Sequence, residues 1–175
     1  MEKKTRAIFL DRDGVINVDT GYPHKIEDCR LIPGAAAAIR RARDAGYMIA
    51  VVTNQGGIAL GYYDEAALLH FNVHLARLLE EDGAVLDAIS FCPHHPSAPD
   101  PALRQCSCRK PLPGMLLELA EKYDIAMNES AMIGDRITDL EAGEAAGVRA
   151  FLFDGGNLDE MMRHVLARLD EGQDG

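Results

Sequence analysis

The sequence contains no apolar run that approaches the roughly 18 residues needed to span a membrane. Its first residues, MEKKTRAIFLDRD, carry an apolar stretch much shorter than the core of a secretory signal. Internal repeats and low-complexity segments are also missing. We therefore expect a cytoplasmic protein without a membrane partner, in a compartment where disulfides seldom persist.

Basic residues are scarce relative to acidic ones. The chain has 18 Lys and Arg against 28 Asp and Glu, which gives a formal net charge of -10 and a pI near 5.0. Such a chain repels a polyanion unless its basic groups are concentrated locally, so we expect no nucleic-acid partner. An anionic substrate would need local help from a metal ion, a lysine or a helix N-terminus.

The size and composition are those of an ordinary globular protein. The 175 residues, of which 47% are hydrophobic, suit a single domain over 1–175 with a sizeable core. The helical patterns carry no long heptad repeat, which favours a monomer.

Short runs rich in β-branched residues alternate with helical patterns along the chain. The predicted strands cover residues 6–11, 47–54, 84–91, 130–135 and 148–153. The predicted helices cover residues 33–46, 65–81, 114–123, 138–147 and 157–171, and a frayed tail is expected at 171–175. This alternation predicts an α/β fold, a doubly wound and mostly parallel sheet with helices on both faces.

Polar side chains follow the predicted strands at their carboxyl ends, where parallel sheets bind ligands. Asp11 and Asp13 come directly after the first strand, Thr53 ends the second, and Asp135 follows the fourth. Three acids at one edge, with no basic partner between them, would raise one another's pKa values or collect a hard cation such as Mg²⁺. The alternative is that they are solvated loop residues or helix caps.

Four motifs together carry a family resemblance. DRDGVIN, TN at the end of the second strand, RKPLPG and GDRITD occur in order. They resemble the four motifs of the haloacid dehalogenase-type phosphatases, and the resemblance extends over nearly the whole chain. It implies hydrolysis of a phosphomonoester through an aspartyl-phosphate intermediate with Mg²⁺ as cofactor.

The resemblance also assigns roles to single residues. Asp11 would be the nucleophile and Asp13 the general acid and base. Thr53 and Lys110 would hold the phosphoryl oxygens. Mg²⁺ would be bound by the Asp11 carboxylate, the Asp13 backbone carbonyl and Asp135. Asp139 would support Lys110 or the metal.

A second cluster lies in the segment CPHHPSAPDPALRQCSCRKP. Cys92 and His94 form one pair and Cys106 and Cys108 another, and residues two apart in extended chain point the same way. The two pairs supply the ligands of a closed structural zinc site within a loop at 92–108. A disulfide or simple burial of the thiols are the alternatives, with His95 as an alternative ligand. Cys29 lies far away in sequence and is expected to be packed in the core.

The zinc loop ends at Arg109 and Lys110, so the metal could fix the lysine on an otherwise loose connection. The segments between the motifs are too short for a large cap domain, so loops must recognise the substrate. These loops resemble those of the family branch that acts on a small phosphorylated sugar, heptose bisphosphate. The resemblance implies that six residues contact the substrate: Asp19, Tyr22, Asn54, Gln55, Arg109 and Arg136.

Within that resemblance, Arg109 would bind the phosphate that is retained. Arg136 could instead pair with a surface carboxylate. Relatives commonly have serine where this chain has Gly56, which removes a hydroxyl contact. Two other functions stay open: hydrolysis of histidinol phosphate, whose ammonium group would favour acidic surroundings, and a non-catalytic zinc-binding interaction module.

Overall fold

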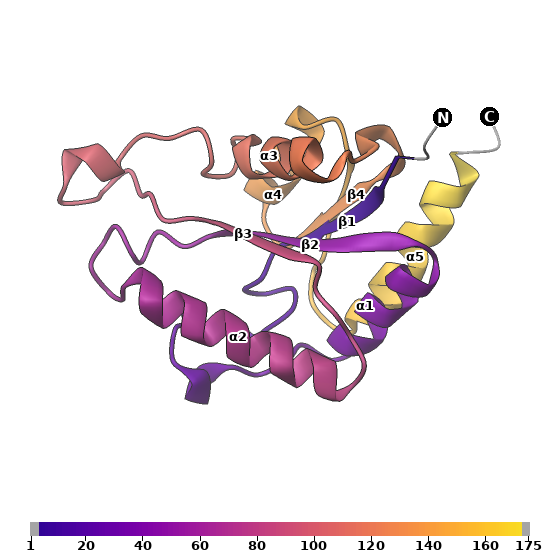
Figure 1. The fold of residues 1–175 in the computed structure, drawn as a ribbon, viewed down its shortest axis with the longest axis horizontal. Coiled ribbons are helices and arrows are strands. Elements are labelled where there is room, and N and C mark those ends of the chain that lie inside the picture. The colour runs from indigo at the N-terminus through magenta and orange to yellow at the C-terminus, as the bar shows by residue number, and fades with distance from the viewer. Residues whose placement is uncertain (1–3, 173–175) are drawn as a thin grey trace.

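The computed structural model describes residues 4–172 and contains one five-stranded sheet with helices on both of its faces (Figure 1). The strands are β1 (Arg6–Leu10), β2 (Tyr47–Asn54), β3 (Ala88–Cys92), β4 (Ala131–Gly134) and β5 (Arg149–Leu152). The helices are α1 (Ala35–Asp44), α2 (Glu65–Glu81), α3 (Gly114–Tyr123), α4 (Ile137–Ala145) and α5 (Leu158–Glu171). The predicted fold class is confirmed. Of the predicted tail, residues 173–175 lie outside the described part.

All strand pairs are parallel, and the strand order is β3-β2-β1-β4-β5. The chain builds outward from β1 to β3 and then returns to the other side of β1 for β4. The sheet therefore has a topological switch point between β1 and β4, where ligands of such folds bind. This point lies at the carboxyl ends of the two strands.

The two faces of the sheet carry separate hydrophobic cores. One core packs α1, α2 and α5 against the sheet through buried residues such as Ile39, Phe71 and Val165. The other packs α3 and α4 through residues such as Leu116 and Ala142. Figure 1 shows the two helical layers above and below the sheet. The strands are buried on both faces, which explains their almost uninterrupted apolar sequences.

Local signals place several helix ends as predicted. The side chain of Asp64 accepts a hydrogen bond from the Ala67 backbone N–H at 2.8 Å and caps α2. Gly46 lies just past α1 with a φ of +85°, a conformation that glycine adopts at no steric cost. Within residues 4–172, no helix has the length and hydropathy required to cross a membrane.

The third strand is shorter than predicted at its start. It begins at Ala88, whereas the apolar pattern predicted a strand from residue 84. Asp87 explains the difference, because its carboxylate accepts a hydrogen bond from Ile49 N at 2.8 Å and pairs with Arg43. The Asp87 backbone N–H still donates to the Ile49 carbonyl at 2.9 Å, but the Asp87 side chain replaces the backbone carbonyl that would otherwise accept from Ile49 N.

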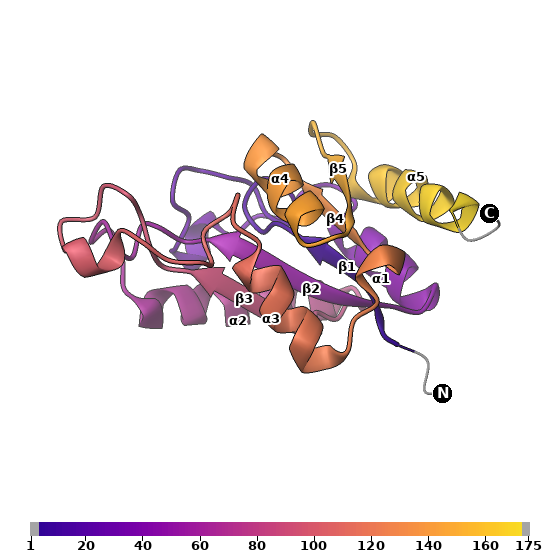
Figure 2. The same ribbon diagram turned by 90° about the horizontal axis from the view of Figure 1, so that it is seen from above.

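The segment between β3 and α3 extends away from the sheet, on the side opposite α5 (Figures 1 and 2). Its beginning is held by the sheet, because Cys92 is paired with Asn54 across β3 and β2. The cysteine-rich loop therefore starts beside the TN motif at the end of β2.

Candidate active site

The site is built at the switch point between β1 and β4. Leu10 is paired with Ile133, and the backbone N–H of Asp11 donates to the Ile133 carbonyl at 3.0 Å, so Asp11 and Asp135 leave the sheet side by side. Gly14, with a φ of +87°, lets the loop after β1 come close to Asp135. A Cβ at this glycine would lie 2.2 Å from Asp135 Oδ2, so a larger residue would push the two loops apart.

Three carboxylates converge at this edge. Asp11, Asp135 and Asp139 each offer an oxygen within 4.8 Å of the others. Asp135 Oδ1 is buried and has no hydrogen-bond partner among residues 4–172. An unpaired buried carboxylate oxygen is costly, and a hard cation with oxygen ligands would satisfy it. The donor set therefore fits Mg²⁺, as expected for Asp11 and Asp135.

Lys110 lies among these carboxylates, although it is 99 residues from Asp11 in sequence. Its buried ammonium is 2.6 Å from Asp139 Oδ1 and 3.0 Å from Asp11 Oδ1, and it donates to the Val52 carbonyl at 2.8 Å. The expectation that the acids have no basic partner between them is therefore wrong. The family resemblance had indicated Asp139 as a partner of Lys110, but the additional contact with Asp11 depends on the long loop after β3, which brings the lysine back to the sheet.

Burial dominates the electrostatics of the cluster. Burial raises the pKa of Asp11 to about 7, although attraction to the Lys110 ammonium opposes the rise. Burial also raises the pKa of Asp135, and repulsion from Asp139 adds to the effect. For Lys110, burial lowers the pKa, but attraction to Asp11 and Asp139 outweighs it, so the pKa lies above its ordinary value. Near neutral pH, a metal ion must therefore compete with a proton at Asp11.

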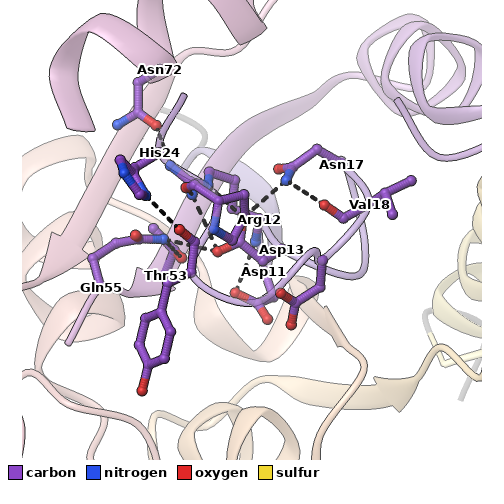
Figure 3. A network of polar contacts seen from close by, with 12 residues as sticks. Asp11, Arg12, Asp13, Asn17, Val18, His24, Thr53, Gln55 and Asn72 are labelled. Atoms are coloured by element: carbon purple, nitrogen blue, oxygen red, sulfur yellow. Dashed lines mark hydrogen bonds and ion pairs between the residues drawn. The ribbon is translucent and has the colours of Figure 1, made fainter. Parts of the chain in front are cut away.

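The Asp13 side chain is not part of this carboxylate cluster. Its two oxygens accept hydrogen bonds from Arg12 at 2.8 and 3.2 Å, from Asn17 at 2.9 Å and from Gln55 at 3.1 Å (Figure 3). The Asp13 side chain is thus oriented by its neighbours and also lines the pocket described next. Arg12 was missed from sequence, because an arginine between two acids reads as a solvated charge, whereas here it is fully buried.

A pocket of about 410 Å³ opens above the carboxylates. All six residues predicted to contact substrate line it, together with Asp11, Asp13, Thr53 and Lys110. The lining residues that the sequence did not single out for this pocket are Gly21, Tyr63, His95, Ile137 and Thr138. Ile137 and Thr138 lie within the GDRITD motif, whereas Gly21, Tyr63 and His95 lie outside the four motifs, and only the folded chain reveals that these three face the same space.

Several predicted substrate contacts bind other residues in this structure. Asn54 exchanges two hydrogen bonds with the backbone of Lys110, at 3.0 and 3.1 Å, and so fixes the loop that carries the lysine. Arg136 pairs with Asp19 at 3.2 Å, and both side chains line the pocket. The expected alternative, a surface carboxylate as the partner of Arg136, is therefore partly correct, since this carboxylate also lines the pocket.

The cysteine-rich loop gathers its four predicted ligands. Cys92, His94, Cys106 and Cys108 place one ligand atom each within 4.8 Å of the others. Cys106 Sγ lies 3.6 Å from Cys92 Sγ, and His94 Nδ1 lies 3.5 Å from Cys92 Sγ and 3.4 Å from Cys108 Sγ. A tetrahedral zinc site with ordinary bond lengths has ligand–ligand separations of about 3.5 to 3.8 Å. These three separations fit zinc, whereas Cys92 Sγ and Cys108 Sγ lie closer together than two zinc ligands do.

The sulfurs of Cys92 and Cys108 lie close enough to form a disulfide. A disulfide would use only these two groups and would give Cys106 and His94 no reason to converge on them. His95, the alternative ligand, is outside the cluster and lines the pocket instead. Cys29 is buried in the core, as expected.

The cysteine cluster is joined directly to the pocket. The backbone N–H of Arg109 donates to Cys106 Sγ at 3.4 Å, and its guanidinium donates to the His94 carbonyl at 3.0 Å. Hydrogen bonds of this kind to ligand sulfurs orient metal sites. Because Lys110 is the next residue, the cysteine cluster and the buried lysine are joined by one short stretch of chain.

Known proteins match this chain over most of its length. Residues 107–170 match the HAD-hydrolase-like family model. D-glycero-β-D-manno-heptose-1,7-bisphosphate 7-phosphatase of Haemophilus ducreyi is 42% identical over 145 residues, which cover 82% of this chain and 80% of that protein.

Crystal structures of two proteins also match. One is a HAD-like phosphatase from Mesorhizobium loti, at a TM-score of 0.89 and 35% identity, with 97% of this chain and 88% of that chain covered. The other is the D,D-heptose 1,7-bisphosphate phosphatase from B. bronchiseptica in complex with magnesium and phosphate, at a TM-score of 0.78 and 36% identity, with 94% and 87% covered. Like the motifs and the pocket, these matches show that the chain belongs to the HAD-like phosphatase family of the D-glycero-D-manno-heptose 1,7-bisphosphate 7-phosphatases.

Proposed function

We propose that this protein hydrolyses the C7 phosphate of D-glycero-D-manno-heptose 1,7-bisphosphate and releases heptose 1-phosphate and inorganic phosphate. The observation that carries the proposal is one pocket that combines a buried acid cluster around Lys110 with a second cation, Arg109. A bisphosphate needs both: one site for the phosphate that reacts and one for the phosphate that stays. The similarity to heptose bisphosphate phosphatases supports the same substrate.

In the first half-reaction, the Asp11 carboxylate attacks phosphorus and the bond from phosphorus to the C7 oxygen breaks. Asp13 donates a proton to that oxygen as it leaves. In the second half-reaction, water attacks the aspartyl phosphate, Asp13 takes a proton from it, and the bond to Asp11 breaks. Lys110 and Thr53, both buried at the base of the pocket, bind the phosphoryl oxygens as charge develops on them.

The residues proposed to hold Mg²⁺ are Asp11 and Asp135 through their carboxylates and Asp13 through its backbone carbonyl. When bound, the ion offsets the repulsion between the nucleophile and the phosphate dianion. Asp139 pairs with Lys110 and so keeps the ammonium beside Asp11.

We expect Mg²⁺ to bind more weakly as the pH falls below about 7. The pKa of Asp11 is raised to about 7 by burial, so lowering the pH from 8 to 6 protonates a carboxylate that the metal needs. The apparent dissociation constant should rise toward tenfold per pH unit at the acid end. Isothermal titration calorimetry across this range measures the change, and an affinity that is independent of pH would contradict it.

A substrate screen tests the proposed reaction. Release of phosphate should be fastest with heptose 1,7-bisphosphate, slower with histidinol phosphate, and detectable with 4-nitrophenyl phosphate, always in the presence of Mg²⁺. A clear preference for histidinol phosphate would replace the sugar substrate by the amino alcohol. No turnover of any of the three by folded, metal-loaded protein would favour the non-catalytic zinc-binding module.

Arg109→Met should weaken the action on the bisphosphate selectively. Loss of a charge-assisted contact to the retained phosphate should lower kcat/KM by about 10- to 100-fold. For 4-nitrophenyl phosphate, which has no second phosphate, kcat/KM should change little. Arg77→Met, which removes an exposed guanidinium on α2, is the control and should leave both values unchanged. Equal losses on both substrates would show that Arg109 does not recognise the second phosphate.

We also propose that the cysteine cluster holds structural zinc, because four donors fit its coordination sphere. The expectations of a single domain, a cytoplasmic location and a monomer stay predictions. We further propose that four other residues contact the sugar, because the resemblance indicates them and they line the pocket: Asp19, Tyr22, Gln55 and Arg136.

A further inference from the structure

Arg12 is the largest fully buried side chain among residues 4–172, and it binds the proposed general acid. Its Nε and Nη2 donate to the two oxygens of Asp13, at 2.8 and 3.2 Å. A guanidinium that holds both oxygens of a carboxylate fixes its plane as well as its position. Figure 3 shows Arg12 at the centre of this network.

The rest of the guanidinium is anchored outside the catalytic loop. Nη1 donates to Asn72 Oδ1 at 2.9 Å, Nη2 also donates to the Pro23 carbonyl at 3.0 Å, and the guanidinium lies 4.3 Å above the Phe71 ring. Phe71 and Asn72 belong to the buried face of α2. Arg12 thus connects the Asp13 carboxylate to α2, a helix that contributes no residue to the pocket lining.

Burying a guanidinium is expensive, and apolar residues of similar volume fill such space at a lower cost. Stability alone therefore gives little reason for an arginine at this position. The hydrogen bonds instead restrict a side chain whose orientation matters for proton transfer, because a general acid must lie within hydrogen-bond reach of the leaving oxygen.

We propose that Arg12 is a positioning residue for Asp13, held in place by α2, and that it sets the geometry of protonation of the leaving group. The proposal rests on the proposed function. It predicts that loss of Arg12 lowers the rate more for a substrate with a poor leaving group than for one with a good leaving group. A sugar alkoxide is a poor leaving group and needs the proton, whereas 4-nitrophenolate leaves readily without one.

The test compares kcat/KM for heptose bisphosphate and for 4-nitrophenyl phosphate, since this constant reports the steps up to formation of the aspartyl phosphate. Arg12→Lys keeps the charge but cannot hold both carboxylate oxygens. It should lower kcat/KM by about 30-fold or more for the sugar substrate, and by less than about threefold for the aryl substrate. Asp13→Asn should likewise lower the ratio of kcat/KM for the sugar substrate to kcat/KM for the aryl substrate. In the Asp13→Asn background, Arg12→Lys should change the ratio no further, because both act through one group.

A second variant covers the case in which Arg12→Lys does not fold. Asn72→Ala leaves Arg12 in place but removes one of its acceptors, and should shift the ratio in the same direction by about three- to tenfold. The matched control is Arg41→Met. Arg41 holds both oxygens of Asp159 at 2.7 and 3.0 Å, far from the pocket, so its loss should lower Tm and leave the ratio unchanged.

Equal losses on both substrates in the Arg12 and Asn72 variants would overturn the proposal and leave Arg12 with a structural role only. A change of ratio in Arg41→Met would overturn it as well, because loss of stability would then explain the effect. Failure of the wild-type protein to hydrolyse either substrate would instead refute the proposed function on which the inference depends.

Discussion

Asp11→Asn is expected to abolish turnover and to leave the fold intact. The amide cannot attack phosphorus, so kcat should fall by about 10⁴-fold or more. Little stability should be lost, because burial already raises the pKa of Asp11 to about 7 and Lys110 keeps Asp139 as a partner. Phosphate release measures the first effect. Thermal unfolding of the metal-free protein measures the second, and Tm should stay within a few degrees, about the change expected from 1 kcal/mol.

The matched control for this variant is Asp124→Asn. Asp124 lies at the end of α3 with a φ of +48°, a conformation that asparagine tolerates, and its side chain is exposed. The same chemical change at this position should leave kcat at the wild-type value. Mass spectrometry of acid-quenched reactions should detect a phosphoryl group on the wild-type protein and none on Asp11→Asn. Activity close to wild type in Asp11→Asn would exclude Asp11 as the nucleophile.

Removal of the metal from the cysteine cluster should have the largest effect on stability. Cys106→Ser replaces a proposed zinc ligand, which is also the acceptor of the Arg109 backbone N–H. Because structural zinc contributes directly to folding, Tm should fall by about 10 °C or more. Activity at 25 °C should fall at least about tenfold as well, since Lys110 follows directly on the loosened loop. Differential scanning calorimetry, the zinc content and phosphate release measure the three changes.

Cys29→Ala is the control, because Cys29 is buried in the core and outside the cluster. It should retain one zinc ion per chain and full activity, with a modest loss of stability. A count of reactive thiols under denaturing conditions with a chelator and no reductant separates zinc from a disulfide. Zinc leaves all four cysteines reactive, whereas a Cys92–Cys108 disulfide leaves only Cys29 and Cys106. Full activity of verified zinc-free protein would refute the proposed role of the cluster.

The motifs predicted the position of the site because they follow strands. Asp11 follows β1 and Asp135 follows β4, and in a parallel sheet such residues share one edge. The cysteine pairs were equally informative, because their spacing alone brings ligands together two at a time. In the first case, the pairing of parallel strands brings together acids that lie far apart in the sequence; in the second, each pair of ligands is set by the local spacing.

Pairings between distant segments could not be predicted in this way. Nothing near Arg12 in the sequence indicates that it lies against Phe71 and Asn72, which are about sixty residues away. Likewise, the position of His95, in the pocket rather than in the cysteine cluster, depends on how the loop after β3 returns to the sheet.

The sequence by itself predicted the fold class, the acids at the strand ends and the four residues that meet in the cysteine cluster, because alternation and spacing can be recognised in neighbouring residues. The tertiary structure alone decided that Lys110 also contacts Asp11 and that Arg12 is buried against Asp13, whereas the resemblance had already indicated Asp139 as a partner of Lys110. Folding removes these charged groups from the water that would hydrate them in an unfolded chain, and each then needs an opposite charge beside it.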